Sequence, residues 1–388
     1  MVLLIVGEKI RLFLTDEQVQ QFKKYSGASR FIYNTCLAEC IRAYQEDGIS
    51  LKKLNLIKYA ESLKYDEKYS WLKEISSGVV RVAAQDVASA FNNFYKRGNK
   101  GFPRFKKKGK CKESFGLKAD LTHCRFEDSK HLKFSKIREP VQIREHWIPD
   151  KMLNPRVSFD GKFWYFSFSY EIPDADLTIN QENKNITGVD LGIKSLAVTS
   201  GGVIYKNINK SKRVKQLEKR KRHLQRKLSR KYQMNKEDSN FVKTNNIIKL
   251  EQEIRLIDRK LKNIRNTYIH QVTYDLVKTK PACIVIEDLN VKGMMKNKHL
   301  SKAIQQQEFY KFRQYISYKC QGYGVRLVVA NRFYPSSKTC SCCGHKKKFL
   351  SLKERTYICH ECGLVTDRDL NAAINLKIYG KEKLIKIA

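Results

Sequence analysis

Acidic side chains are scarce in this chain, which has 39 Asp and Glu against 77 Lys and Arg and a formal net charge of +38. Such a surplus makes a compact chain repel itself unless a polyanion neutralises it. The basic residues run through almost the whole length and are not confined to one amphipathic helix. A long nucleic acid therefore fits better than a membrane surface, and the alternative is a basic surface that only keeps the protein in solution.

Long hydrophobic runs are also missing. No apolar run approaches the ~20 residues of a membrane-spanning helix, so we expect no membrane partner. The opening MVLLIVGEKIRLFL is apolar, but no basic segment precedes it and no small-residue cleavage site follows, which argues against a secretory signal peptide. Apolar residues still make up 41% of the 388 residues, enough for folded cores, and at roughly 150 residues per domain the length predicts two or three domains.

Cysteines are unevenly distributed, because five of the eleven lie in one short C-terminal stretch. An odd number without a secretory signal makes a disulfide framework a poor interpretation and favours a reducing interior. Cys340-x2-Cys343, fifteen residues and Cys359-x2-Cys362 have the spacing of a four-thiolate zinc site. A glycine follows the second cysteine of each pair, which selects Cys343 and not its neighbour Cys342 as the ligand.

Helical patterns dominate the first hundred residues. Thr15-Asp-Glu-Gln18 has the pattern of a capping box that opens a helix running towards Gln45 and ending near Gly48. Two further helical patterns cover about 51–64 and 78–96.

A basic loop with Gly and Pro follows at 97–110, and the pattern then changes to period two until about residue 172. The clearest hairpin spans 156–171, where Asp160-Gly161 predicts a type I′-like turn.

The stretch from about 208 to 277 predicts two antiparallel helices with a coiled-coil-like seam, interrupted near Met234–Asn240. Its first arm is intensely basic, and we expect Arg220, Lys221 and Arg222 to contact phosphates. The alternative is a solvated face. Beyond it the order is strand, helix, strand, small insertion and helix, which indicates an α/β sheet with an inserted module.

Three acidic residues stand out against the basic background. Asp190 follows one strand, Glu287 ends the apolar strand CIVIE, and Asp369 lies at the start of the last helix. Each alone could be a turn aspartate, a strand-end charge or a helix cap. Together they can meet at one edge of a parallel sheet, where carboxylates about 4–5 Å apart need cations. Two Mg²⁺ would satisfy them and activate water to attack a phosphodiester.

These residues also carry a family resemblance. In this order, GVDLGIKSLAV, IVIEDLNVKGM, YPSSKTCSCCG, CHECG and DRDLNAAINL resemble the three RuvC motifs and the zinc ribbon of TnpB, the insertion-sequence-associated RNA-guided nucleases formerly called OrfB transposases. Compact type V CRISPR effectors are similar. The resemblance extends more weakly to Gln85, Phe91, Phe94 and GFPRFK at 101–106.

The resemblance implies a catalytic triad and metal ligands. The family's Mg²⁺- or Mn²⁺-binding acids fall on Asp190, Glu287 and Asp369, with Asp367 as the competitor for the last position. Its zinc ligands fall on Cys340, Cys343, Cys359 and Cys362. One departure is visible, because 265–270 lacks the acid that many members carry in an R-x-D-x-x-H stretch.

The resemblance also implies an architecture and partners. We expect an α+β multidomain protein with a β-barrel wedge domain (1–14 and 111–182) and a helical recognition lobe (15–110). A RuvC/RNase H-like nuclease (183–388) follows, with a basic helical hairpin at 208–277 and a zinc ribbon at 335–365.

The partners would be a guide RNA from the transposon end and double-stranded target DNA beside a short motif. We expect a monomer with one RNA, in the cytoplasm and on the nucleoid of a prokaryotic cell. Lys106, Lys107 and Lys108 are further expected phosphate contacts.

Three alternatives stay open at this point. A non-cleaving RNA-guided repressor would be expected to have lost part of the triad, which is complete here. A transposase could use the same acids for strand transfer. A compact CRISPR effector of the same fold would be distinguished by a repeat array beside the gene in place of an insertion-sequence end.

Overall fold

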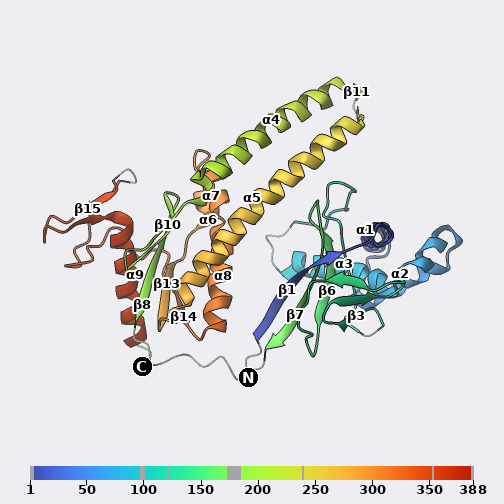
Figure 1. The fold of residues 1–388 in the computed structure, drawn as a ribbon, viewed down its shortest axis with the longest axis horizontal. Helices are drawn as coiled ribbons and strands as arrows, with labels where there is room; N and C mark the ends of the chain where they lie inside the picture. The colour runs from blue at the N-terminus through green and yellow to red at the C-terminus, as the bar shows by residue number, and fades with distance from the viewer. Residues whose placement is uncertain are drawn as a thin grey trace. The chain divides into compact units, whose positions relative to one another are not determined.

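The computed structural model describes residues 4–96, 101–120, 122–172, 185–237, 240–351 and 354–385. The chain divides into two compact units, Met1–Pro173 and Asp174–Ala388, whose elements are labelled in Figure 1. Among the described residues, no helix is both long enough and apolar enough to cross a membrane.

The helical part of the first unit begins where the sequence predicts. The Thr15 side chain and Gln18 form the expected capping box at the start of α1 (Asp16–Asp47), and Gly48 ends the helix with a left-handed φ of +67°. This conformation strains residues with a side chain but suits glycine. The other helices are α2 (Lys53–Ser62), the 3₁₀ turns η1 (Leu63–Tyr65) and η2 (Glu67–Glu74), and α3 (Ser77–Lys96).

Seven strands of the first unit form one antiparallel sheet in the order β2-β6-β7-β1-β5-β4-β3. The sheet curves like half a barrel, and β2 and β3 are its two edges, so the expected barrel is open. The strands are β1 (Leu4–Phe13), β2 (Ser114–Gly116), β3 (Cys124–Asp128), β4 (His131–Phe134), β5 (Val141–Ile143), β6 (Leu153–Phe159) and β7 (Trp164–Ile172).

The helices and the sheet of the first unit share one hydrophobic core. Phe22 of α1 is fully buried and meets Phe115, Phe134 and Trp164 of the sheet edge-on, with ring centroids 5.4–5.5 Å apart. Such edge-to-face pairs add to the stabilisation from buried area. The described helices between residues 15 and 96 are therefore packed onto the sheet as part of the same unit.

The hairpin of β6 and β7 forms as expected, but its turn is of another type. A type I′ turn needs a positive φ at both central residues, and only Gly161 has one, at +97°. Asp160 instead accepts hydrogen bonds through its carboxylate from the backbone N–H of Lys162 (3.1 Å) and Phe163 (2.9 Å). This Asx-type bonding holds the turn without a left-handed aspartate.

The second unit is built on a five-stranded sheet in the order β10-β9-β8-β13-β14. β8, β9 and β10 are antiparallel neighbours, whereas β13 runs parallel to β8 and β14 parallel to β13. Their bounds are β8 (Ile186–Leu191), β9 (Ser195–Thr199), β10 (Ile204–Lys206), β13 (Cys283–Glu287) and β14 (Arg326–Ala330).

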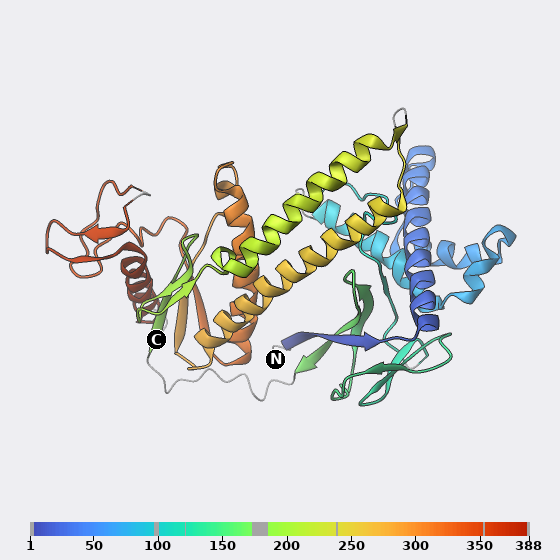
Figure 2. The same ribbon diagram turned by 45° about the horizontal axis from the view of Figure 1, so that its top comes forward.

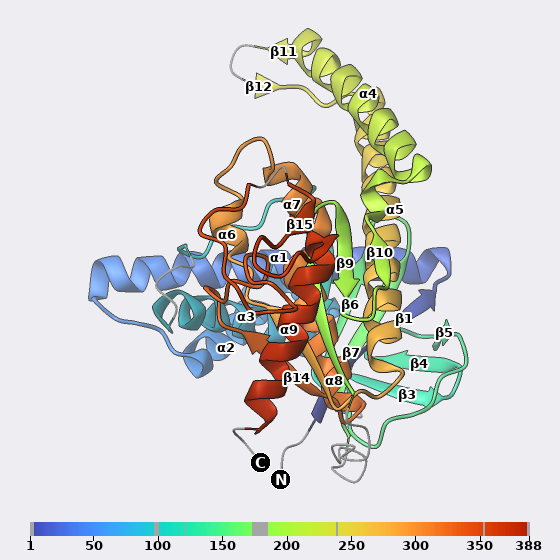
Figure 3. The same cartoon turned by 90° about the vertical axis from the view of Figure 1, so that its left-hand side faces the viewer.

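Helices cover both faces of this sheet (Figures 1 and 3). α9 (Arg368–Ile385) packs on one face, where its Leu376 meets Cys283 and Val285. α5 (Asn245–Val277) and α8 (Phe309–Gly322) pack on the other face, against Ile284 and Ile286. Alternate strand residues point to opposite faces. α6 (Val291–Met294) and α7 (Ser301–Gln307) precede α8.

The single helix that the sequence order predicts between the strands now seen as β13 and β14 is interrupted. Glu308 lies between α7 and α8 with a φ of +51°, a left-handed conformation that a helix cannot continue through.

The basic stretch forms two long antiparallel helices that lie side by side in Figures 1 and 2. α4 (Lys212–Met234) follows a short 3₁₀ turn, η4 (Ile208–Lys210), and pairs with α5. The expected seam is present, because Val214, Leu224, Leu250, Ile254, Ile257 and Leu261 form a buried cluster. The tip carries a two-strand turn, β11 (Lys236–Glu237) and β12 (Asn240–Phe241), which the sequence pattern did not predict.

Candidate active site and cysteine cluster

Asp190 and Glu287 lie at the carboxyl edge of the second sheet. The last residues paired between the parallel strands β8 and β13 are Val189 and Ile286, and Asp190 and Glu287 are the next residues, at the ends of these strands. Because side chains alternate between faces, and Val189 and Ile286 belong to the core beneath α5 and α8, both acids point to the face that α9 covers.

Asp369 reaches the same edge through a close helix–strand contact. A Cβ built on Gly188 would stand 2.0 Å from the carbonyl oxygen of Ala373, so only glycine lets α9 approach β8 this closely. Asp369 is four residues before Ala373, about 6 Å along a helix. Asp190 is two residues after Gly188, about 6.6 Å along a strand.

The other end of α9 fixes its direction. A Cβ on Gly380 would meet side chains of Val285 and Ile186 at 2.4 and 3.2 Å. Later residues of α9 therefore lie against earlier residues of β8, and the helix runs antiparallel to the strand. The start of α9 and the end of β8 meet at one edge.

The three carboxyl groups interact electrostatically. Burial, followed by repulsion from Glu287 and Asp369, raises the pKa of Asp190 well above its usual value. Burial also raises the pKa of Glu287, although a hydrogen bond from Ser336 and the charge of Arg368 partly oppose this. Crowded, partly buried carboxylates of this kind are stabilised by cations, so their oxygen atoms fit divalent metal ions.

The structure separates the roles of Asp367 and Asp369. Asp367 accepts hydrogen bonds from the backbone N–H groups of Asp369 (2.8 Å) and Leu370 (3.2 Å), so it is the N-cap of α9. The side chain of Asp369 is only 17% exposed and lies 4.0 Å from Arg355. Asp369 therefore lies in the first turn of α9, near Asp190, and is not the residue that caps the helix.

Several residues around the acids were not singled out from the sequence. The buried hydroxyl of Ser336 donates to Glu287. Asn375, also buried, donates to the carbonyl oxygens of Ser336 and Thr339, both at 2.7 Å. Asn371 donates to Thr339 at 2.7 Å. These residues belong to the segments YPSSKT and DRDLNAAINL, and only the fold shows that the two segments are hydrogen-bonded to each other.

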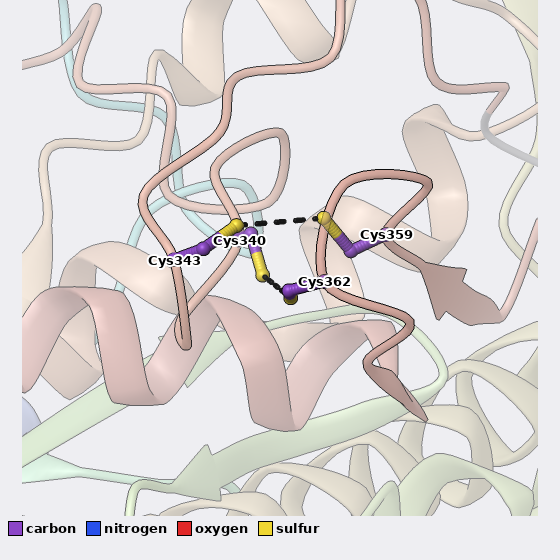
Figure 4. Close-up of side chains that lie close together, drawn as sticks. All are labelled: Cys340, Cys343, Cys359 and Cys362. Atoms are coloured by element: carbon purple, nitrogen blue, oxygen red, sulfur yellow. Dashed lines mark hydrogen bonds between the residues drawn. The ribbon is translucent and has the colours of Figure 1, made fainter.

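Four cysteines form a compact cluster (Figure 4). The sulfur atoms of Cys340 and Cys362 are 3.6 Å apart, as are those of Cys343 and Cys359, and all four lie within 4.8 Å of one another. Four thiolates at about 2.3 Å from a tetrahedral Zn²⁺ are about 3.8 Å apart. Among the described residues, these four cysteines are the group whose ligand atoms are close enough together to hold one ion. The oxygen atoms of Asp190, Glu287 and Asp369 are less tightly grouped.

The two halves of the cysteine cluster repeat one backbone turn. Gly344 and Gly363 have φ of +78° and +71°, and each donates its N–H at 3.0 Å to the carbonyl of the first cysteine of its pair. The cluster contains Cys343, whereas the exposed Cys342 lies outside it. Hydrogen bonds from the backbone at Cys362 and Glu361 lower the pKa of Cys359 to about 6, which favours the thiolate that binds metal.

The cysteine cluster is attached to the start of α9. Its two-stranded sheet, β15 (Thr356–Ile358) and β16 (Val365–Asp367), leads directly into the helix. Tyr357 fills the small core. The bonds of Asn371 and Asn375 to Thr339 hold the first cysteine turn against the helix, so the cluster and Asp369 share one support.

The basic residues expected to contact phosphates differ in how exposed they are and in whether they already have a partner within the protein. Lys107 and Lys108 are exposed, whereas the ammonium of Lys106 lies 3.6 Å from the ring centroid of Tyr33 and burial lowers its pKa. On α4, Arg220 pairs with Glu253 and Lys221 with Asp258 of α5.

Arg222 is exposed and bonds instead to the carbonyl of Glu218 at 3.4 Å. With Arg226 and Arg230, which are also exposed, it forms a row on the side of α4 away from Leu224.

A curated relative shows the family. The chain is 30% identical over 380 residues to a Streptomyces pristinaespiralis protein named "Putative RNA-guided DNA endonuclease", with 96% of this chain and 88% of that protein covered. The chain belongs to the TnpB family.

Other relatives agree with TnpB membership. An Escherichia coli K12 protein named "Putative RNA-guided DNA endonuclease InsQ" is 27% identical, with 96% and 91% of the two chains covered. The OrfB_IS605 family, described as "Probable transposase", matches residues 167–298, and the Cas12f1-like TNB domain family matches 309–376. A family described as "Helix-turn-helix domain" matches 1–48, where this TnpB chain has strand β1 and the single helix α1.

Solved structures support the fold of this TnpB protein. A chain from a cryo-EM structure of a Cas12f1–sgRNA–target DNA complex matches with a TM-score of 0.56 and 16% identity, covering 97% of this chain and 99% of that chain.

Proposed function

We propose that this TnpB protein is a transposon-associated, RNA-guided DNA endonuclease. A guide RNA would select the target by base pairing, and the protein would recognise a short motif beside it. The observation that carries the proposal is the meeting of Asp190, Glu287 and Asp369 at one sheet edge in a chain with a net charge of +38. The names of the full-length relatives support the same activity.

The second unit is best described as a RuvC/RNase H-like nuclease. The strand order supports this, with three antiparallel strands followed by two parallel ones. We keep the division into a β-barrel wedge domain (1–14 and 111–182) and a recognition lobe (15–110), whose described residues share one core; the boundary at 182 lies outside the described residues. The nuclease would span 183–388, with the hairpin at 208–277 and the ribbon at 335–365.

Asp190, Glu287 and Asp369 would hold Mg²⁺ or Mn²⁺. When bound, such ions lower the pKa of water and stabilise charge on a phosphodiester. The protein's own part is to orient the ligands. Ser336 holds Glu287 by a hydrogen bond, and the Gly188 contact places Asp369 beside Asp190.

Cys340, Cys343, Cys359 and Cys362 would hold one structural Zn²⁺. Four thiolates fill a tetrahedral shell and leave no position for a substrate.

Guide-dependent cutting tests the proposed function. The full chain, co-expressed with RNA from its transposon end, should linearise a plasmid with a matching target in the presence of Mg²⁺. Removing the guide match should abolish cutting, because base pairing selects the site. Binding without cutting would favour the repressor, and joining of strands without hydrolysis would favour the transposase; either outcome contradicts the proposal.

The outer row of α4 should contribute to RNA affinity through phosphate contacts. Replacing Arg222, Arg226 and Arg230 with Ala should lower the slope of log affinity against log salt by about 2–3, at ~0.7–0.9 per lost contact. A salt titration of guide-RNA binding by fluorescence anisotropy measures this. A matched variant, Arg220→Ala with Lys221→Ala, removes two residues that already pair with α5 and should change the slope less. Equal slopes for all three proteins would assign the outer row to a solvated face.

A further inference from the structure

A recess opens at the carboxyl edge of the second sheet, next to Glu287 and on the side that α8 covers. It has a volume of about 310 Å³, and its walls include Glu287, Asp288, Tyr310, Arg313 and Arg332. Its floor includes Leu191, Ile286 and Phe309, which belong to the core beneath α8. A recess of this size is at the small end of ligand pockets, about 300–1,000 Å³.

The recess adjoins the acidic cluster across the sheet edge. Glu287 is the last residue of β13, and the next residue, Asp288, bonds to Arg313 of α8 and to Arg332. Glu287 faces α9 and the other acids, while Asp288 faces α8. A strand of nucleic acid crossing this edge would meet the acids on one side and the recess on the other.

The recess is built around two arginines held by one aspartate. Arg313 of α8 donates to one oxygen of Asp288 and Arg332, which follows β14, donates to the other, both at 2.7 Å.

The arginines keep binding capacity for a ligand. A guanidinium has five N–H donors, and the described contacts with Asp288 use one nitrogen of each arginine. Both side chains are 48% exposed. Lys292 adds a third cation to the recess. Because a fork of N–H donors matches phosphate geometry, the recess suits a phosphate group.

An aromatic ring completes the recess. Tyr310 is 70% exposed, although it is on α8 beside the buried Phe309, and its hydroxyl accepts a hydrogen bond from Gln314 at 3.3 Å. Exposed aromatic rings next to cations are the pattern that binds single-stranded nucleic acid, because bases stack on the ring while cations hold the backbone.

We propose that this recess binds the nucleotide next to the cut in the DNA strand being cleaved, with Arg313 and Arg332 on its phosphate and Tyr310 against its base. Asp288 is the positioning residue that holds both arginines. The inference rests on the proposed nuclease function, because it assigns a neighbouring substrate contact to the same sheet edge.

A substrate with one neutral linkage tests the phosphate contact. Single-turnover cleavage is measured with methylphosphonate at each linkage flanking the cut, one at a time, for the guide-loaded parent and for Arg313→Gln and Arg332→Gln. A lost hydrogen bond to a charged group corresponds to ~10- to 100-fold in rate. We expect each variant to slow by about this factor on normal DNA, and one methylphosphonate position to slow the parent equally.

The combination of variant and modified DNA decides the matter. If the arginine contacts that phosphate, the methylphosphonate should slow the variant by less than ~3-fold, because the interaction is already gone. If the slowing caused by the arginine variant and the slowing caused by the methylphosphonate multiply at every flanking linkage, the proposal is wrong. Arg326→Gln, at the opposite end of β14, is the matched control and should show the parent's full methylphosphonate effect.

Tyr310→Ala keeps the proposal testable if the arginine variants fail to fold. Tyr310→Ala should slow cleavage of normal DNA by ~5- to 100-fold, as expected for loss of a stacked base, but should slow cleavage of DNA with an abasic flanking nucleotide much less. Equal slowing on both substrates would overturn the assignment of Tyr310. If the parent cuts neither DNA, the proposed function fails; if the parent cuts and no coupling is found, only the recess proposal fails.

Discussion

Asp190→Ala, Glu287→Ala and Asp369→Ala are each expected to abolish DNA cleavage while guide-RNA and target binding persist. Each carboxylate is assigned to hold metal ions and not nucleic acid. Losing several kcal/mol of charge stabilisation at the phosphodiester corresponds to a rate loss of ~10³-fold or more. Single-turnover cleavage measures the rate, and anisotropy with a catalytically inert, uncuttable target measures binding. A variant that loses binding in parallel with cleavage would contradict the assignment.

Asp367 supplies the matched control for Asp369. Asp367→Ala removes the N-cap of α9 and should cost about 0.5–2 kcal/mol of stability, with a mild effect on cleavage. Asp367→Asn should restore that stability, because asparagine also accepts hydrogen bonds from the helix N-terminus. Full cutting by Asp369→Ala together with an inactive but stably folded Asp367→Asn would show that the two roles are exchanged.

Cys359→Ser is expected to remove zinc from the purified protein, whereas Cys342→Ser should leave about one zinc per chain. A structural site with one weakened ligand loses much of a binding free energy of about 10–16 kcal/mol, and the small core around Tyr357 should unfold locally. Elemental analysis measures the zinc, and limited proteolysis of 335–365 measures the local unfolding. Equal zinc loss from both variants would mean that the cluster uses Cys342.

Zinc loss should also reduce cleavage, although the four cysteines are not among the residues proposed to hold the catalytic metal ions. Asn371 and Asn375 bind the first cysteine turn to α9, so an unfolded ribbon releases the helix start that carries Asp369. Asn371→Ala provides a separate test, because it should keep zinc and still slow cleavage. Unchanged cleavage in a zinc-free Cys359→Ser protein would show that the ribbon and the acids act independently.

The sequence predicted the site best where chemistry constrains single residues. The glycine after Cys343 distinguished it from Cys342, because the turn requires a positive φ at that glycine. The ends of β8 and β13 predicted the edge where Asp190 and Glu287 meet, because parallel strands bring their carboxyl ends together.

Long-range pairings were beyond the reach of the sequence pattern. The bond from Ser336 to Glu287 spans 49 positions, and that from Arg332 to Asp288 spans 44. Local propensity says nothing about such partners. The same holds for Phe22, which lies in a predicted helix but packs on strands of the sheet that the sequence pattern did not identify as its partners. The break at Glu308 was missed because no glycine or proline marks it.

The contact of Gly188 with Ala373 also sets an order of events during synthesis. A growing chain makes β8 and β13 long before α9, and the position of Asp369 against β8 exists only after the last helix has left the ribosome. Until then the strand ends carry two acids without the third. A chain truncated before residue 368 would therefore lack the third acid of the proposed site, and we expect it to be unable to cut DNA.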